Sequence, residues 1–165
     1  MSKVYDFNEQ LALGKIGEAV LDTYFAQWYA IEPFDLAIEK AIGADRLFIS
    51  PRGHQTLVEY KTDFMAHETG NVIVEMVSAD SIGSTGWGVK SQAEILIVFV
   101  YYENRVLIIR MSDLRANLDR WNATYRKIHI RNKRYDTIGI IVPLHEYEEI
   151  AIQQFWDIGK EIGSE

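Results

Sequence analysis

Two carboxylates and a lysine follow a pattern that suits metal-assisted hydrolysis. Glu59 and Lys61 are two positions apart, so on a strand they share one face, and Asp45 lies upstream of them. Carboxylate oxygens are hard ligands that suit Mg²⁺, which proteins often hold with one or two acidic side chains. Taken alone, the triplet Glu-Tyr-Lys is more often an exposed strand with a surface ion pair. The surrounding elements must therefore decide between these two interpretations.

Residues 45–63 predict a β-hairpin that would bring these side chains together. Leu47, Phe48 and Ile49 form one strand-like run, and residues 56–60 form a second. Residues 51–53, Pro-Arg-Gly, supply turn chemistry because Pro presets φ and Gly tolerates positive φ. Pairing about this turn places Asp45 opposite residues 59–61 at the open end of the hairpin.

A helix is expected before the hairpin, over residues 9–28, where apolar residues recur at helical spacing. Glu18 lies beside this apolar stripe, and it is either a site residue or a solvated flanking residue. Gly14 and Gly17 each lower helix propensity by roughly 1 kcal/mol relative to Ala. Close packing of the helix on a sheet is the expected compensation.

Asp45 followed by Glu59-Tyr60-Lys61 resembles the D…(D/E)-x-K motif of the PD-(D/E)xK phosphodiesterase superfamily, which includes restriction endonucleases and Holliday-junction resolvases. The resemblance spans residues 13–100, with Ala44 at the degenerate Pro position and Glu18 matching the Glu of the preceding helix. It implies one α/β domain over residues 1–165, restriction-endonuclease-like, with a central mixed β-sheet and a β-hairpin active site flanked by helices. The implied function is a Mg²⁺- or Mn²⁺-dependent endonuclease that hydrolyses DNA, often as a homodimer.

The same resemblance implies roles for individual residues. Asp45 and Glu59 would bind the metal ion together with the backbone carbonyl of Tyr60. Lys61 would orient or deprotonate the attacking water, or stabilise the charged transition state. Glu18 would support a second metal ion or a metal-bound water.

Glu75 is a further candidate metal ligand within a strand predicted at residues 71–78. A Glu in an apolar strand either has a partner or faces water from an edge strand. Residues 68–75, with Gly86-Trp87 and residues 90–94, are similar to a subset of these nucleases often found in phages and mobile elements. The chain departs from that subset at Gln92, which is inserted between Ser91 and Ala93, and at Glu94, where Asp is usual.

Positive charge is concentrated in residues 115–134, which hold seven basic residues and one acidic residue, while the rest of the chain holds ten and twenty-three. Such a run is either a solvated face or a phosphate-binding surface. Trp87 either stacks on a base or fills the edge of the core. The predicted nucleic-acid contacts are Trp87, Lys90, Gln92, Arg126, Lys127, Arg131, Lys133 and Arg134.

Composition restricts the remaining possibilities. The net charge is −7, which argues against non-specific nucleic-acid binding by the whole surface. The absence of cysteine excludes disulfides and thiolate metal sites and favours the cytoplasm, and no stretch predicts a signal peptide or a membrane span. The four histidines are scattered, and no phosphate-binding loop is present. Two alternatives stay open: an inactive nuclease fold that binds DNA or regulates, and an acidic protein-interaction module.

The remaining predicted elements are an irregular segment or short helix at 34–42, loops at 62–70 and 79–88, strands at 94–102, 106–111 and 137–142, and helices at 113–121 and 144–162. Ser112 is the expected N-cap of the helix at 113–121. The apolar strands and the last helix are the expected interface of a homodimer.

Overall fold

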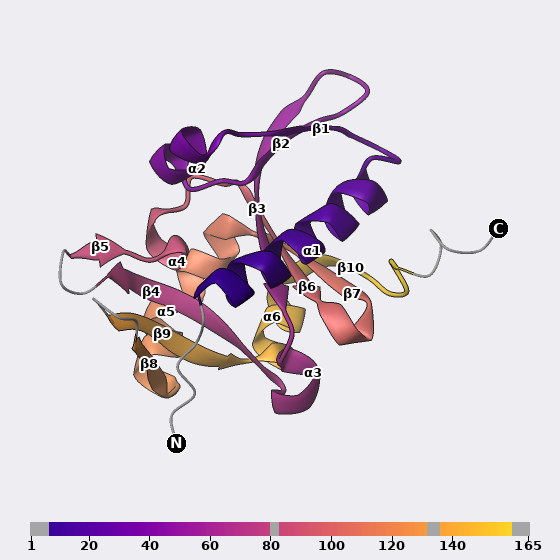
Figure 1. The fold of residues 1–165 in the computed structure, drawn as a ribbon. Helices are drawn as coiled ribbons and strands as arrows, with labels where there is room; N and C mark the ends of the chain where they lie inside the picture. The colour runs from indigo at the N-terminus through magenta and orange to yellow at the C-terminus, as the bar shows by residue number, and fades with distance from the viewer. Residues whose placement is uncertain (1–6, 80–82, 132–135, 160–165) are drawn as a thin grey trace.

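A six-stranded mixed sheet forms the centre of the computed structural model, which describes residues 7–79, 83–131 and 136–159 (Figure 1). Its order is β1-β2-β3-β6-β7-β10, and only the β3–β6 pair is parallel. The strands are β1 Ala30–Pro33, β2 Arg46–Ile49, β3 Gln55–Asp63, β6 Ile95–Val100, β7 Arg105–Arg110 and β10 Ala151–Phe155. The predicted α/β class, with a central mixed sheet flanked by helices, is confirmed.

The predicted hairpin is also confirmed, as strands β2 and β3. Arg46 pairs with Val58 at the open end, and Ile49 pairs with Gln55 beside the turn. Gly53 has a φ of 81°, a left-handed conformation that glycine adopts without a steric penalty. The turn chemistry therefore sets the register that places residues 45 and 59–61 together.

A second, antiparallel sheet lies beside the first, with the order β5-β4-β9-β8. Its strands are β4 Asn71–Ala79, β5 Ser84–Thr85, β8 Lys127–Arg131 and β9 Asp136–Pro143. The strands predicted at 71–78 and 137–142 are thus confirmed as β4 and β9. The loop predicted at 79–88 instead includes β5 and the start of helix α4, Trp87–Lys90.

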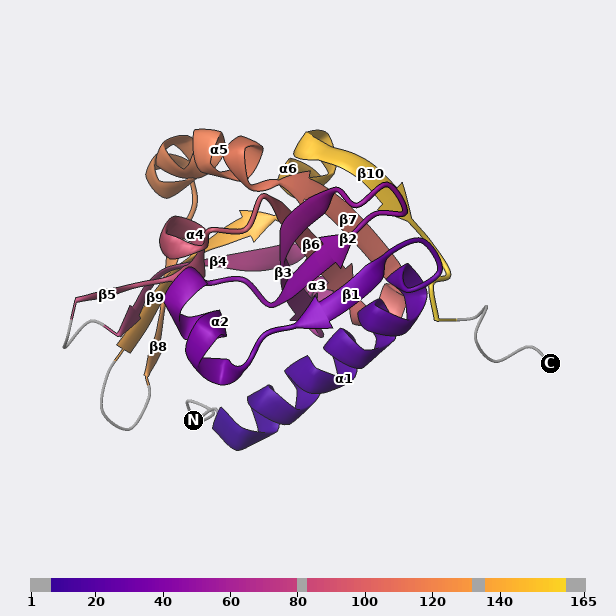
Figure 2. The same ribbon diagram turned by 90° about the horizontal axis from the view of Figure 1, so that it is seen from above.

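Helices cover both faces of the central sheet, with α1 (Phe7–Phe25) on one side and α5 (Met111–Thr124) and α6 (Leu144–Ile150) on the other (Figure 2). The predicted segment at 34–42 forms the short helix α2, Leu36–Ile42. Leu21 belongs to the apolar cluster on the α1 side, and Leu114 and Trp121 belong to the cluster on the other side. In the part of the chain that the structure describes, no helix is long and apolar enough to cross a membrane.

The helix predicted at 144–162 is wrong beyond its first two turns. Helix α6 ends at Ile150, and residues 151–155 form β10, one of the two edge strands of the central sheet. Phe155 pairs with Val106 and Gln154 with Leu107 on β7, so tertiary pairing overrides the local helical pattern.

Two smaller predictions are also corrected. The loop predicted at 62–70 contains the end of β3 and the short helix α3, Ala66–Thr69. Helix α5 begins at Met111, with Arg110 in the cap position and no side-chain cap, so Ser112 is not the N-cap. The strands predicted at 94–102 and 106–111 are confirmed as β6 and β7, joined through the 3₁₀ turn η2, Tyr101–Glu103.

A buried carboxylate fixes helix α6 against helix α5. Glu146 is buried and accepts hydrogen bonds from the Arg120 guanidinium at 2.6 and 2.8 Å, from Trp121 Nε1 at 3.1 Å and from the Tyr125 hydroxyl. The hydrogen bond from Arg120 lowers the pKa of Glu146 to about 2 against the opposing effect of burial. The carboxylate therefore stays ionised and fully bonded inside the fold.

Glycines 14 and 17 of helix α1 differ in their surroundings, and this predicts opposite effects of alanine. A Cβ at Gly17 would lie 1.9 Å from Thr62 Oγ1 on β3, whereas a Cβ at Gly14 would meet nothing within 4 Å. Close packing on the sheet, expected at both positions, is confirmed at Gly17 alone.

Gly17→Ala should cost about 1–3 kcal/mol of unfolding free energy through overpacking. Gly14→Ala should stabilise by about 0.5–1 kcal/mol through helix propensity. Chemical denaturation of the two variants checks this, and equal effects would contradict it.

Candidate active site

Asp45 closes the open end of the β2–β3 hairpin. Its backbone N–H donates to the Val58 carbonyl at 2.9 Å, and its Oδ2 accepts the Tyr60 N–H at 2.7 Å. The carboxylate is thus held beside the backbone between Glu59 and Lys61. The hairpin brings the three predicted motif residues together.

Glu59 and Lys61 project from the same face of β3, opposite to α1. Lys61 Nζ lies 2.7 Å from Glu59 Oε1, and Glu59 is only 5% exposed. Burial raises the pKa of Glu59 to about 7, and the charge of Asp45 adds to this against the opposing effect of Lys61. Burial would lower the pKa of Lys61, but the carboxylates of Glu59 and Asp45 outweigh it and raise that pKa. Lys61 therefore remains an ammonium group at neutral pH.

The ring of Trp87, at the start of α4, packs against the ammonium group of Lys61. Its ring centroid lies 5.3 Å from Lys61 Nζ, within the range of a cation–π interaction. The side chain is buried and belongs to the apolar cluster between the sheets, which matches the interpretation that it fills the edge of the core. Stacking of Trp87 on a base stays a prediction.

Glu75 approaches Lys61 from the second sheet. It lies on β4, which has neighbouring strands on both sides, and it is half-buried, so the interpretation as a water-facing edge residue is wrong. Burial raises the pKa of Glu75, and the charges of Lys61 and Lys90 partly oppose the shift. Glu75 is therefore coupled electrostatically to Lys61.

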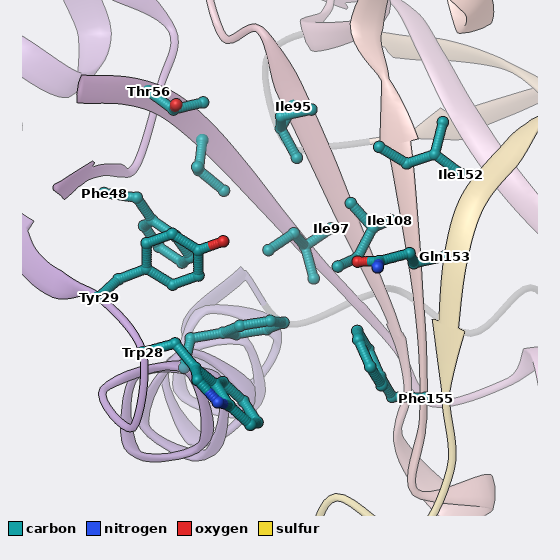
Figure 3. A pocket seen from close by; sticks show the side chains of 12 residues that line it. Trp28, Tyr29, Phe48, Thr56, Ile95, Ile97, Ile108, Ile152, Gln153 and Phe155 are labelled. Carbon is teal, nitrogen blue, oxygen red and sulfur yellow. The ribbon is translucent and has the colours of Figure 1, made fainter. Parts of the chain in front are cut away.

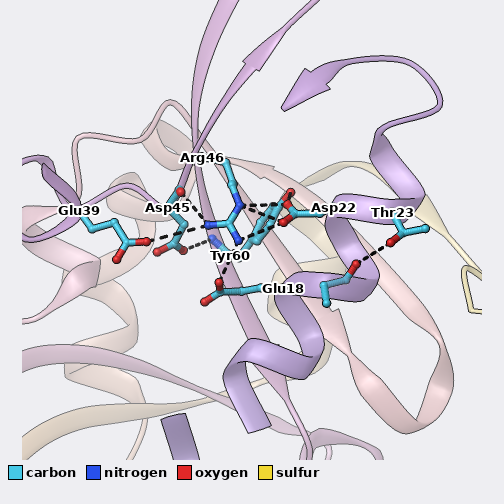
Figure 4. Close-up of polar contacts among 8 residues, drawn as sticks. Glu18, Asp22, Thr23, Glu39, Asp45, Arg46 and Tyr60 are labelled. Carbon is cyan, nitrogen blue, oxygen red and sulfur yellow. Dashed lines mark hydrogen bonds and ion pairs between the residues drawn. The ribbon is translucent and has the colours of Figure 1, made fainter. Parts of the chain in front are cut away.

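On the α1 face of the hairpin, Arg46 lies among carboxylates (Figure 4). Arg46 is 7% exposed; its Nε lies 3.0 Å from Asp22 Oδ1, and its Nη2 lies 2.9 Å from Glu18 Oε2. Its Nη1 donates to the Asp45 carbonyl at 2.9 Å and lies 4.0 Å from Glu39 Oε1. Burial would lower the pKa of Arg46, but Asp22 and Glu18 outweigh it. The predicted site residue Glu18 is thus bound to a guanidinium.

Sequence reasoning missed Asp22, Glu39 and Arg46. Asp22 follows Glu18 by one helical turn on α1, and this i, i+4 pair of acids was a signal for a shared cation. Glu39 comes from α2, and no sequence pattern connects it to the hairpin. Burial raises the pKa of Glu39, and the charges of Asp45 and Glu18 raise it further.

The site carries more negative than positive charge. Its carboxylates are Glu18, Asp22, Glu39, Asp45, Glu59 and Glu75, and the cations paired within it are Arg46 and Lys61. Asp45, Glu59 and the Tyr60 carbonyl offer the hard oxygen atoms that Mg²⁺ prefers. Among the described residues, no group of three or more acidic or histidine side chains is arranged to hold a metal ion.

Four of the predicted nucleic-acid contacts lie in two separate groups. Lys90 and Gln92 are exposed near α2, since the Gln92 N–H donates to the Ile42 carbonyl. Lys127 and Arg131 are exposed on β8, where Lys127 pairs with Ile140 and Ile140 pairs with Val74. Directly paired residues share a face, so these two cations lie on the face opposite to Glu75.

Three other predicted contacts have different outcomes. Arg126 is exposed just before β8. Lys133 and Arg134 lie outside the described residues. The structure thus brings Asp45, Glu59, Trp87 and Glu75 around Lys61, and it does not bring the basic strand to the same face.

No protein family, curated protein or solved structure significantly matches this chain.

The Arg46 cluster predicts a clear stability effect. Arg46→Met should lower the free energy of unfolding by about 1–3 kcal/mol, because it removes the buried guanidinium that the partly exposed Glu18 and Asp22 share. Adding Asp22→Asn should restore part of this loss. Arg52→Met, in the exposed hairpin turn, is the matched control and should change stability by less than about 0.5 kcal/mol. Urea denaturation measures all three, and an Arg46 variant as stable as the control would contradict the prediction.

The raised pKa of Glu59 predicts a pH-dependent difference between wild type and Glu59→Gln. Between the unfolded pKa near 4.3 and the folded pKa of about 7, the native state binds a proton that the unfolded state lacks. Native stability therefore falls as pH rises through this range, and the Gln variant lacks this contribution. Relative to wild type, Glu59→Gln should gain up to about 3 kcal/mol between pH 5 and pH 8. Denaturation at several pH values checks this, and a constant difference would refute it.

Proposed function

We propose that this protein is a Mg²⁺- or Mn²⁺-dependent endonuclease of the PD-(D/E)xK type that hydrolyses DNA phosphodiester bonds. One observation carries the proposal. Asp45, Glu59 and Lys61 converge at the open end of the β2–β3 hairpin, where Asp45 binds the Tyr60 amide and Lys61 pairs with Glu59. Glu59 is buried, whereas the carboxylate of a surface ion pair on an exposed strand would be accessible to solvent.

In this proposal Asp45, Glu59 and the backbone carbonyl of Tyr60 hold the metal ion. When bound, the ion supplies polarisation of the phosphate and a lowered pKa for its water. Burial raises the pKa of Glu59 even with Lys61 beside it, so a bound metal ion would favour the anionic form of this carboxylate. The chain's own contribution is to keep two carboxylates together at one strand end.

Lys61 acts as a fixed positive charge. Its raised pKa disfavours a role in taking a proton from water and favours stabilisation of the charge that develops on the phosphate. Glu59 and the ring of Trp87 hold the ammonium group in place. Preorganised charges of this kind need no reorganisation during the reaction.

Glu18 and Asp22 act on the site through Arg46. Their ion pairs fasten α1 to the hairpin, and Arg46 donates in turn to the Asp45 carbonyl. Tyr60 joins the same network, since its hydroxyl donates to Asp22 Oδ1 at 3.1 Å. These residues position the backbone that carries Asp45 and Glu59.

Cleavage assays on supercoiled, linear and branched DNA test the proposal. We expect nicking with Mg²⁺ or Mn²⁺, none with EDTA, and a loss of about 10²–10³-fold in rate for Lys61→Ala, because a transition-state charge is removed. Lys40→Ala, on the exposed side of α2, is the matched control and should cleave like wild type.

The other outcomes are equally informative. Salt-dependent DNA binding without cleavage of any substrate would favour an inactive nuclease fold that binds DNA or regulates. Loss of both binding and cleavage would favour an acidic protein-interaction module.

A further inference from the structure

A polar hollow of about 560 Å³ opens between the start of β6 and the start of α5. The polar side chains that line it are Arg110, Arg115, Glu94, Ser112 and Thr56. A second hollow, of about 460 Å³ on the α1 side of the central sheet, differs in chemistry (Figure 3). Its described lining, which includes Trp28 and Phe155, contains no charged residue. Of the two, the polar hollow offers the groups that bind an anion.

The charged lining of the polar hollow carries one more positive than negative charge. Arg110 and Arg115 each bring a guanidinium group, and Glu94 brings one carboxylate. Asp113 lies 3.8 Å from Arg110, but their side chains are 60% and 44% exposed, so water screens that pair. A hollow with two guanidinium groups therefore stands out on a chain whose net charge is −7.

Arg115 ties the hollow to the segment that leads out of the candidate active site. Its Nη2 donates to the carbonyls of Val89, at 3.3 Å, and of Ser91, which flank Lys90 in the chain. Lys90 is exposed at the end of α4, and its charge opposes the raised pKa of Glu75. The other N–H groups of Arg115 form no bond within the described residues, so they can donate to a ligand.

The chain from Trp87 to Glu94 connects the candidate active site with the hollow. The Trp87 ring lies 5.3 Å from Lys61 Nζ, and the Glu94 N–H donates to the Leu57 carbonyl at 2.9 Å. Leu57 precedes Glu59 by two residues on β3, which is about 7 Å of strand. Helices α2 and α5 lie on either side of α4 along this path (Figure 2). The hollow thus lies close to the hairpin carboxylates.

The basic residues near β8 do not lie on this path. Lys127 and Arg131 are on the face opposite to Glu75, and Arg120 is bound to Glu146. The cations along the path are instead Lys90, Arg115 and Arg110.

We propose that the polar hollow binds a backbone phosphate of the DNA strand that occupies the candidate active site, with Arg110 and Arg115 as its donors. The inference rests on the proposed function, because it adds a second contact for the same substrate. Successive phosphates of a strand rise about 3.4 Å along a duplex, so this phosphate lies roughly two to three nucleotides from the bond that is cut. Each phosphodiester carries one negative charge, which matches the excess positive charge of the lining. Ser112 and Thr56 supply hydroxyl groups of the kind that contact phosphate oxygens.

DNA binding by Arg110→Gln and Arg131→Gln compares the hollow with β8 through the same substitution at two exposed arginines. Fluorescence anisotropy of a labelled DNA duplex in EDTA, over a series of salt concentrations, measures binding without cleavage. Arg110→Gln should raise the dissociation constant about five- to tenfold and lower the slope of log K against log salt concentration by about 0.9, because one phosphate contact is lost. Arg131→Gln should change neither quantity. Arg115→Gln should act like Arg110→Gln, and thermal denaturation shows that each variant is folded.

Two binding results would overturn the inference. They are wild-type affinity in both Arg110→Gln and Arg115→Gln, and a loss of affinity in Arg131→Gln as large as that in Arg110→Gln. A complete absence of DNA binding at low salt would overturn it together with the nuclease proposal.

Cleavage assays separate the hollow from the nuclease proposal. We expect Arg110→Gln to raise KM about five- to tenfold if wild type cleaves DNA. Cleavage with an unchanged KM would reject the hollow and leave the nuclease proposal standing. Binding that depends on Arg110 without any cleavage would support the hollow as a DNA contact and reject the nuclease proposal.

Discussion

The arrangement of the site depends on one buried guanidinium. Arg46 is the first residue of β2. It binds Asp22 and Glu18 of α1 and also contacts Glu39 of α2. A buried charge of this kind is tolerated only when partners compensate it, so each helix must stay where its carboxylate meets Arg46. The donation from Arg46 to the Asp45 carbonyl then transmits that constraint to the backbone of the site.

Side chains alternate between the two faces of a strand, so the residues that position the site and the residues proposed for catalysis lie on opposite faces of the hairpin. Arg46 and Tyr60 face α1, whereas Glu59 and Lys61 face Trp87 and the second sheet. A shift of one residue in the β2–β3 register would exchange the two sets and bury the wrong charges. Asp45 joins the two faces, because its carboxylate accepts the Tyr60 N–H at the strand end.

Local signals were enough to predict the hairpin, and non-local pairing explains most of what was missed. The apolar runs, the Pro-Arg-Gly turn and the spacing of Glu59 and Lys61 are all contained in one short segment. Strand β10 owes its structure to β7, which lies far away in sequence, and its own residues also suit the end of a helix. Arg46 was overlooked for the same reason, since its partners come from α1 and α2 and no spacing within the hairpin reveals them. Glu39 could be recognised as a site residue only after the fold had brought it to Arg46, whereas the spacing of Glu18 and Asp22 was a signal that the sequence already contained.

The carboxylates of the site lower the stability of the folded state, and this cost is informative about function. Burial raises the pKa values of Glu59, Glu39 and Glu75, so each carboxylate costs free energy when it ionises in the folded state. Glu146 is the contrasting case in the same fold, because every hydrogen bond to it lowers its pKa. Glu59, Glu39 and Glu75 have fewer hydrogen-bond and ion-pair partners than Glu146, so their negative charges are less fully compensated. Such residues are typical of sites where function is retained at the expense of stability, and the proposed metal ion would compensate their charge.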